Sequence, residues 1–226
     1  MTKMKLCGLF RPCDIDAANQ LKPEYIGFVF APKSRRYVTP EEAAELKKLL
    51  APTIQAVGVF VNEAAERIAA LLNKGIIDIA QLHGVEDENE INQLRALTDK
   101  PIIKAFCIKK SEDITNAESC LADYILLDSG EGTGTVFDWK KIQNIQRPYF
   151  LAGGLSIDNV ENAVRQLNRM RSMSVQALRQ MGSKIKRKWR HLLLLSERKN
   201  DYDESKRTLR DSRWTVYSRN IDECSD

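Results

Sequence analysis

The sequence predicts an α/β protein, specifically a (β/α)8 TIM barrel, on the strength of three observations. Short apolar runs of strand length alternate with polar segments of helical pattern over most of the chain. The repeat from one strand to the next is about 20 to 25 residues, which is the length of one barrel unit. Polar residues follow the ends of several different strands, whereas a doubly wound open sheet uses mainly one switch point.

Seven apolar runs predict seven strands, and three segments between them have the pattern of helices. The runs are rich in Ile, Val, Phe and Tyr, and their near-continuous hydrophobicity is typical of strands covered on both faces. The helical segments have prolines or acids near their starts and Lys or Gly near their ends. The expected strands are 4–10, 25–30, 55–61, 77–84, 101–108, 124–129 and 149–155, and the expected helices are 40–50, 63–75 and 86–100.

Composition narrows the class of protein. The chain has 226 residues with 43% hydrophobic content, and no apolar run approaches the roughly 20 residues of a membrane span. The first ten residues have no signal-peptide pattern, so we expect a cytoplasmic protein without membrane contact. The five cysteines form no CxxC pair, and the two histidines, His83 and His191, are far apart in the sequence. This argues against a metal site and against a disulfide framework.

Charge and glycine content change near Asn168. Residues 1–168 carry 20 Lys and Arg against 23 Asp and Glu, whereas residues 169–226 carry 15 against 8. All seven prolines and ten of the eleven glycines lie in the first part. We therefore divide the chain into a barrel domain of residues 1–168, which holds strands one to seven, and a basic tail of residues 169–226.

Five motifs in order carry a family resemblance. They are "KLCGLFRPCDI" from residue 5, "GFVFAPKSRRYVTPEEA" from residue 27, "QLHG" from residue 81, "LLDSGEGTGTVFDW" from residue 126 and "LAGGLSIDNV" from residue 151. A single one of them would occur by chance, but five at barrel spacing are specific. Together they resemble phosphoribosylanthranilate isomerase of tryptophan biosynthesis, over residues 3 to about 168.

The resemblance implies an isomerase that converts N-(5-phosphoribosyl)anthranilate to 1-(2-carboxyphenylamino)-1-deoxyribulose 5-phosphate by an Amadori rearrangement. This reaction needs one acid and one base and no metal or cofactor. By resemblance, Asp128 is the acid and Cys7 is the base. On their residue types alone, Cys7 also fits a small buried hydrophobe, and Asp128 fits a turn or capping residue at a strand end.

The same resemblance implies groups that bind the phosphorylated small-molecule substrate. An arginine at Arg36 holds the anthranilate carboxylate, for which a guanidinium fork is suited, and Arg35 is the competing assignment. Gly153 and Gly154 let backbone amides approach the phosphate after the seventh strand. His83 either contacts substrate or fixes its strand end through a hydrogen bond. We expect a monomer or a homodimer.

The tail departs from the family. At an eighth strand and last helix the family has a segment like "NPYALDVSSGVETDG", whose Ser-Gly backbone completes the phosphate site, whereas this chain reads "NRMRSMSVQA" from Asn168. Codons can be chosen for "NRMRSMSVQA" such that one extra base after the Asn168 codon makes the same bases encode "NPYALDVSSG". We therefore hypothesise that an out-of-frame tail replaces the eighth strand and last helix and leaves an open seven-stranded barrel.

Two other functions stay open from the sequence. One is another phosphate-binding barrel enzyme of the pathway, such as indole-glycerol-phosphate synthase, which relies on a catalytic lysine and on glutamates of early strands. The other is an inactive truncated barrel with a nucleic-acid-binding tail, because residues 183–191 form a basic run with an aromatic side chain. Contact with nucleic acid is not our main expectation.

Overall fold

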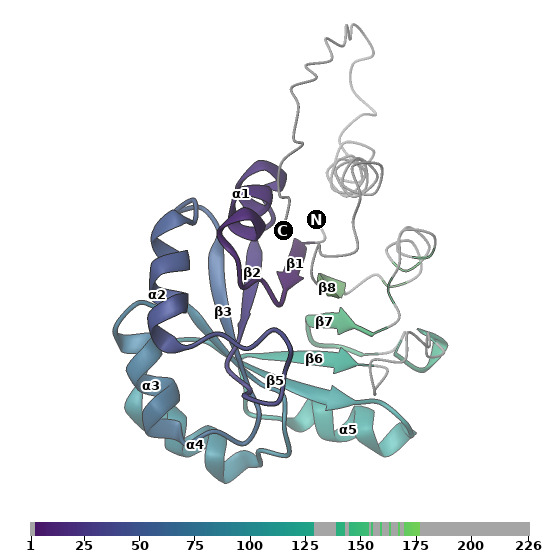
Figure 1. Ribbon diagram of the computed structural model, residues 1–226. Coiled ribbons are helices and arrows are strands. Elements are labelled where there is room, and N and C mark those ends of the chain that lie inside the picture. The colour runs from purple at the N-terminus through teal and green to yellow at the C-terminus, as the bar shows by residue number, and fades with distance from the viewer. Residues whose placement is uncertain are drawn as a thin grey trace, which may run out of the picture.

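The computed structural model describes residues 3–128, 139–142, 145–153, 155, 159, 163, 167 and 170–176, and within them eight parallel strands form a closed barrel in chain order (Figure 1). This confirms the predicted TIM barrel over the doubly wound sheet. The strands are β1 Lys3–Cys7, β2 Tyr25–Val29, β3 Gln55–Phe60, β4 Ile79–Leu82, β5 Ile102–Cys107, β6 Tyr124–Asp128, β7 Tyr149–Ala152 and β8 Met170–Gln176.

The helices on the outside of the barrel begin where the sequence carries helix-start signals. The Thr39 hydroxyl accepts from the backbone N–H of Glu42, and the Glu42 carboxylate accepts in return from the N–H of Thr39. Asp87 and Glu90 form the same reciprocal pair at the start of the helix that begins at Glu88. The helices are α1 Pro12–Leu21, α2 Pro40–Leu49, α3 Ala65–Asn73, α4 Glu88–Leu97 and α5 Ser111–Ser119, with a 3-10 turn η1 at Trp139–Ile142.

Successive strand residues alternate between two apolar layers. On β1, Met4 and Leu6 belong to the layer between barrel and helices, together with Ile15 of α1. The barrel interior is filled by a second cluster, which includes Val57 and Leu126. Because both faces of each strand are covered, the strands read as continuous apolar runs rather than alternating ones.

The barrel is closed by β8, which the sequence analysis did not expect. Met170–Gln176 pairs in parallel with β7 and with β1, where Met173 is the register partner of Met4. The expectation of an open seven-stranded barrel is therefore wrong, because the first residues of the tail form the eighth strand. These residues can form a strand because strand pairing uses backbone groups and the stretch has no proline or glycine. Apolar Met173 and Val175 also alternate with polar residues, as in a strand. The expected replacement of the family's last helix falls on residues after Gln176, which lie outside the described part of the chain.

A buried ion pair joins the loops that follow β3 and β4. The Lys104 ammonium on β5 donates to Glu86 Oε2 at 2.8 Å and to the Gly84 carbonyl at 2.9 Å. The Glu86 carboxylate also accepts the backbone N–H groups of Asn62 and Gly84. Burial alone would raise the pKa of Glu86, but the Lys104 hydrogen bond and charge and the Asn62 N–H together hold that pKa below its usual value.

Candidate active site

The predicted site residues follow the carboxyl ends of different strands, which in a parallel barrel all open onto one rim. Cys7 ends β1, Asp128 ends β6, His83 comes directly after β4 and Gly153 directly after β7. Gly153 has a φ of 77°, a left-handed conformation that favours glycine. The predicted phosphate ligand Gly154 lies outside the described residues. The rim of this barrel therefore presents a thiol, a carboxylate and an imidazole.

His83 and Asp128 are brought together from strands far apart in the sequence. His83 Nε2 lies 3.5 Å from Asp128 Oδ2, and both side chains are partly exposed. The other ring nitrogen, Nδ1, lies 2.6 Å from Nε2 of Gln81, whose side chain is buried. The backbone N–H of His83 donates to the Phe60 carbonyl at 2.8 Å, which fixes the residue at the end of β4. The imidazole thus sits between a buried carboxamide and the rim carboxylate.

Cys7 and Lys5 extend from β1 toward the same position on β2. A Cβ placed on Gly27 would lie 2.7 Å from the Cys7 sulfur and 3.1 Å from Lys5 Nζ. Only glycine leaves both side chains their room, because a methyl group there would overlap the sulfur. Lys5 is fully buried, and its ammonium has no hydrogen-bond partner within the described part of the chain.

Arg36 reaches the rim beside Cys7. The segment after β2 folds back on it, with the Val38 N–H donating to the Val29 carbonyl at 3.0 Å. A Cβ on Gly8 would lie 2.5 Å from Arg36 Cδ, and Gly8 has a φ of 83°. The Arg36 side chain therefore packs over the residue next to Cys7 and is partly buried, whereas Arg35 is exposed. Of the two competing arginines, the structure brings Arg36 to the site.

Two buried polar residues of this region were missed by the sequence analysis, namely Lys5 and Gln81. The signal was available, because each is a polar residue inside an otherwise apolar strand, in "KLCG" and "QLHG". Buried polar groups in such positions require a partner or a function.

The described residues contain neither a metal-binding cluster nor a membrane-spanning helix. No group of three or more His, Cys, Asp or Glu side chains in the described ranges is arranged to hold a metal ion. No helix of the described part is long and apolar enough to cross a membrane.

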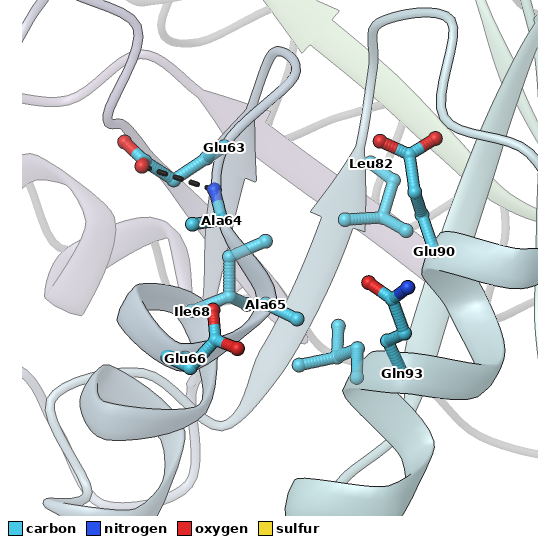
Figure 2. A pocket seen from close by; sticks show the side chains of 9 residues that line it. Glu63, Ala64, Ala65, Glu66, Ile68, Leu82, Glu90 and Gln93 are labelled. Carbon is cyan, nitrogen blue, oxygen red and sulfur yellow. Dashed lines mark hydrogen bonds between the residues drawn. The ribbon is translucent and has the colours of Figure 1, made fainter.

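A hollow of about 160 Å³ lies between α3 and α4, and Figure 2 shows the side chains that line it. Two of its three carboxylates bond to nearby backbone: Glu63 accepts from the N–H of Ala64, and Glu90 accepts from that of Asp87. We assign it no function, because its carboxylates serve the local fold. It is lined by Glu63, Ala64, Ala65, Glu66, Ile68, Leu82, Glu90, Gln93 and Leu94.

A closed parallel barrel with a carboxylate, an imidazole, a thiol and a guanidinium on its carboxyl-end rim has the architecture of a TIM-barrel enzyme that works by acid–base chemistry. Comparisons with known proteins give the family. The family model described as N-(5'phosphoribosyl)anthranilate (PRA) isomerase matches residues 4–175, which reaches into β8. The chain belongs to the phosphoribosylanthranilate isomerase family.

Individual relatives agree with the family match. The N-(5'-phosphoribosyl)anthranilate isomerase of Endomicrobium trichonymphae is 41% identical over 173 residues, which cover 74% of this chain and 84% of that protein. The crystal structure of the Thermotoga maritima isomerase has a TM-score of 0.76 and 28% identity over 87% of this chain and 99% of that one. An isomerase in complex with reduced 1-(o-carboxyphenylamino)-1-deoxyribulose 5-phosphate has a TM-score of 0.72 and 27% identity, over 84% and 97% of the two chains.

Proposed function

We propose that this chain isomerises N-(5-phosphoribosyl)anthranilate to 1-(2-carboxyphenylamino)-1-deoxyribulose 5-phosphate, with Asp128 as the acid and Cys7 as the base. The observation that carries the proposal is the position of the two groups. Each is the last residue of its strand, β6 for Asp128 and β1 for Cys7, and both strands end at the rim where Arg36 packs. Relatives that bear this activity match the chain over both strands.

The reaction moves protons within the substrate and needs no external oxidant. Asp128 gives a proton to the furanose ring oxygen, the bond from that oxygen to the anomeric carbon breaks, and a cationic Schiff base forms. Cys7 then removes the proton from the neighbouring sugar carbon, which leaves an enolamine that tautomerises to the aminoketose. One proton is delivered and one is taken up, so the sum is an isomerisation.

The substrate's two anionic ends need separate partners. Arg36 is suited to the anthranilate carboxylate, because a guanidinium offers two parallel N–H donors to a planar anion. Gly153, with its left-handed backbone at the end of β7, is suited to a close approach by the phosphate. We also propose that His83 belongs to the site through its contact with Asp128.

This activity is a step of tryptophan biosynthesis, for which we propose a cytoplasmic enzyme with a small phosphorylated substrate and no nucleic-acid partner. The Thermotoga maritima relative is described as dimeric, and monomers of it have been generated. For this chain, monomer and homodimer are both compatible with the proposal.

We further infer that residues 169–226 arise from a single-base deletion after the Asn168 codon. The support is the change in charge and glycine content at that point, together with the codon reading that restores "NPYALDVSSG".

The assay compares the chain as written with the chain in which one base is restored, each purified and mixed with N-(5-phosphoribosyl)anthranilate. We expect the restored chain to form the aminoketose and to rescue a tryptophan auxotroph that lacks the isomerase. We expect much weaker turnover from the chain as written, because it lacks the Ser-Gly segment that the family uses at the phosphate. No turnover by either chain, when both are folded, would show that the proposed function is wrong.

Resequencing the gene around the Asn168 codon tests the frame proposal separately. We expect either an additional base at that point or, with the gene unchanged, no stable 226-residue product when cell extracts are examined by mass spectrometry. An unchanged gene together with an abundant full-length product contradicts the proposal.

A further inference from the structure

Gln81 is a polar side chain in the barrel interior, on the short strand β4. Its side chain is 2% exposed, and its register partners on the neighbouring strands, Val59 and Ile103, are buried and apolar. Placing a carboxamide in such surroundings is unfavourable unless its polar atoms are bonded. One of them is bonded, because Nε2 lies 2.6 Å from Nδ1 of His83, while Oε1 has no partner among the described residues.

This contact selects one form of the His83 ring. A carboxamide nitrogen only donates, so Nδ1 must accept, and the single proton of the neutral ring is then on Nε2. In the described orientation one N–H and the oxygen of Gln81 have no partner, whereas the opposite orientation would leave both N–H groups without one, and an unpaired buried N–H is the rarer case. With its proton on Nε2, the ring presents a donor atom 3.5 Å from Asp128 Oδ2, a long but favourable charge–dipole contact.

We propose that Gln81 is a positioning residue for the reaction, and that it orients the acid Asp128 through His83. The inference rests on the proposed function in one respect, the role of Asp128 as the acid. Because Oδ2 faces the Nε2–H donor, the proton of the neutral carboxylic acid resides on Oδ1. The acid therefore holds its proton on the oxygen that is turned away from the imidazole. Gln81 does not touch the substrate in this scheme.

Other titratable and charged groups lie on the elements that pack against this chain of contacts. Cys107 on β5 is the register partner of Asp128, and Cys7 ends β1 on the same rim. Lys104 on β5 and Glu86 after β4 bond to each other. Lys109 follows β5. Within the described residues the hydrogen-bond partner of the Gln81 carboxamide is the His83 ring, so Gln81 acts on Asp128 through His83.

The tautomer is tested by nitrogen NMR on the full-length chain with 15N-labelled histidine. The chain has only two histidines, so substitution of His83 by Asn identifies its signals. In the neutral His83 ring of the parent chain we expect the proton on Nε2. In Gln81→Glu, whose carboxylate only accepts, we expect a proton at Nδ1. A parent ring protonated at Nδ1, or unchanged signals in Gln81→Glu, would overturn the proposal.

Kinetics test the consequence for Asp128 in the same full-length chain and, in parallel, in the base-restored chain. Gln81→Met keeps the volume and removes the donor, so we expect kcat to fall about tenfold or more, as when other supporting partners of reactive groups are removed. KM should stay within about twofold, because Gln81 does not bind substrate. Gln55→Glu, an exposed site on β3, is the matched control and should leave both constants unchanged.

Three outcomes are separable. Unchanged kcat in a folded Gln81→Met variant contradicts the positioning role. A lower kcat that is accompanied by a lower thermal midpoint, with an unaltered His83 tautomer, would show that Gln81 only supports the fold. That result also contradicts the positioning role. Full activity of Asp128→Asn would refute the proposed acid while leaving the NMR result on the tautomer intact, so failure of the function and failure of this inference are distinguished.

Discussion

Replacement of Cys7 by Ala or of Asp128 by Asn is expected to lower kcat by two to four orders of magnitude, about 10²- to 10⁴-fold, with KM little changed. Each variant removes one of the two proposed proton transfers and leaves Arg36 and Gly153, the proposed partners of the substrate's anionic ends, in place. Asp128→Asn keeps the shape of the side chain but has no proton to deliver to the ring oxygen. The measurement is steady-state turnover of N-(5-phosphoribosyl)anthranilate in the base-restored chain, with binding of the product measured alongside.

Cys107→Ala is the matched control for both variants. Cys107 is an exposed thiol at the end of β5, directly paired in register with Asp128. It has no role in the proposed reaction, so its removal should leave turnover at the parent level. Near-normal kcat in Cys7→Ala or in Asp128→Asn would show that the role assigned to that residue is wrong.

Lys104→Met is expected to have the largest effect on stability, a loss of about 3 to 5 kcal/mol in the free energy of unfolding at neutral pH. The substitution leaves the Glu86 carboxylate buried beside apolar atoms, and it removes the donor to the Gly84 carbonyl. The measurement is urea denaturation of the full-length chain. Lys48→Ala is the control, because its partner Glu45 is as exposed as Lys48 itself, and we expect it to cost well under about 1 kcal/mol.

The contribution of Glu86 to the free energy of unfolding should depend on pH. The folded-state pKa of Glu86 is lowered from the ordinary value of 4.5. The stability that comes from its ionised form is therefore fully present above about pH 4.5 and is lost as the pH falls through the lower folded-state value. The difference between the parent chain and Lys104→Met should accordingly shrink in acid. A difference that stays constant from neutral pH to acid would contradict the assigned cause.

Most of the barrel could be predicted from the sequence because strand and helix signals are local. The seven apolar runs coincide with strands β1 to β7. The reciprocal caps at Thr39 and Asp87 lie where acids and a proline mark helix starts. The eighth strand was missed because its family motif is absent. Pairing with β1 and β7 depends on backbone groups, which any stretch without proline can supply.

The site was predictable only in part. Motif order located Cys7, His83 and Asp128 at strand ends, and these residues do lie on one rim. Which polar atoms face one another depends on the closure of the barrel, so the contacts of Gln81 with His83, and of His83 with Asp128, could not be read from spacing. The same holds for Lys5, whose surroundings include a glycine of the neighbouring strand.

The pairing of β8 with β1 and β7 shows that closure of the barrel and the chemistry of its last strand are two separate properties. Hydrogen bonds between main chains do not depend on which side chains a strand carries, so under the proposed deletion a segment translated in another frame would still close the barrel. A frameshift near the end of such a gene would then leave a fold that still resembles the family's barrels when whole structures are compared. Detection of the error has to rely on the chemistry of the last strand, on a buried cation without its anion or a phosphate without its amides, rather than on the outline of the barrel.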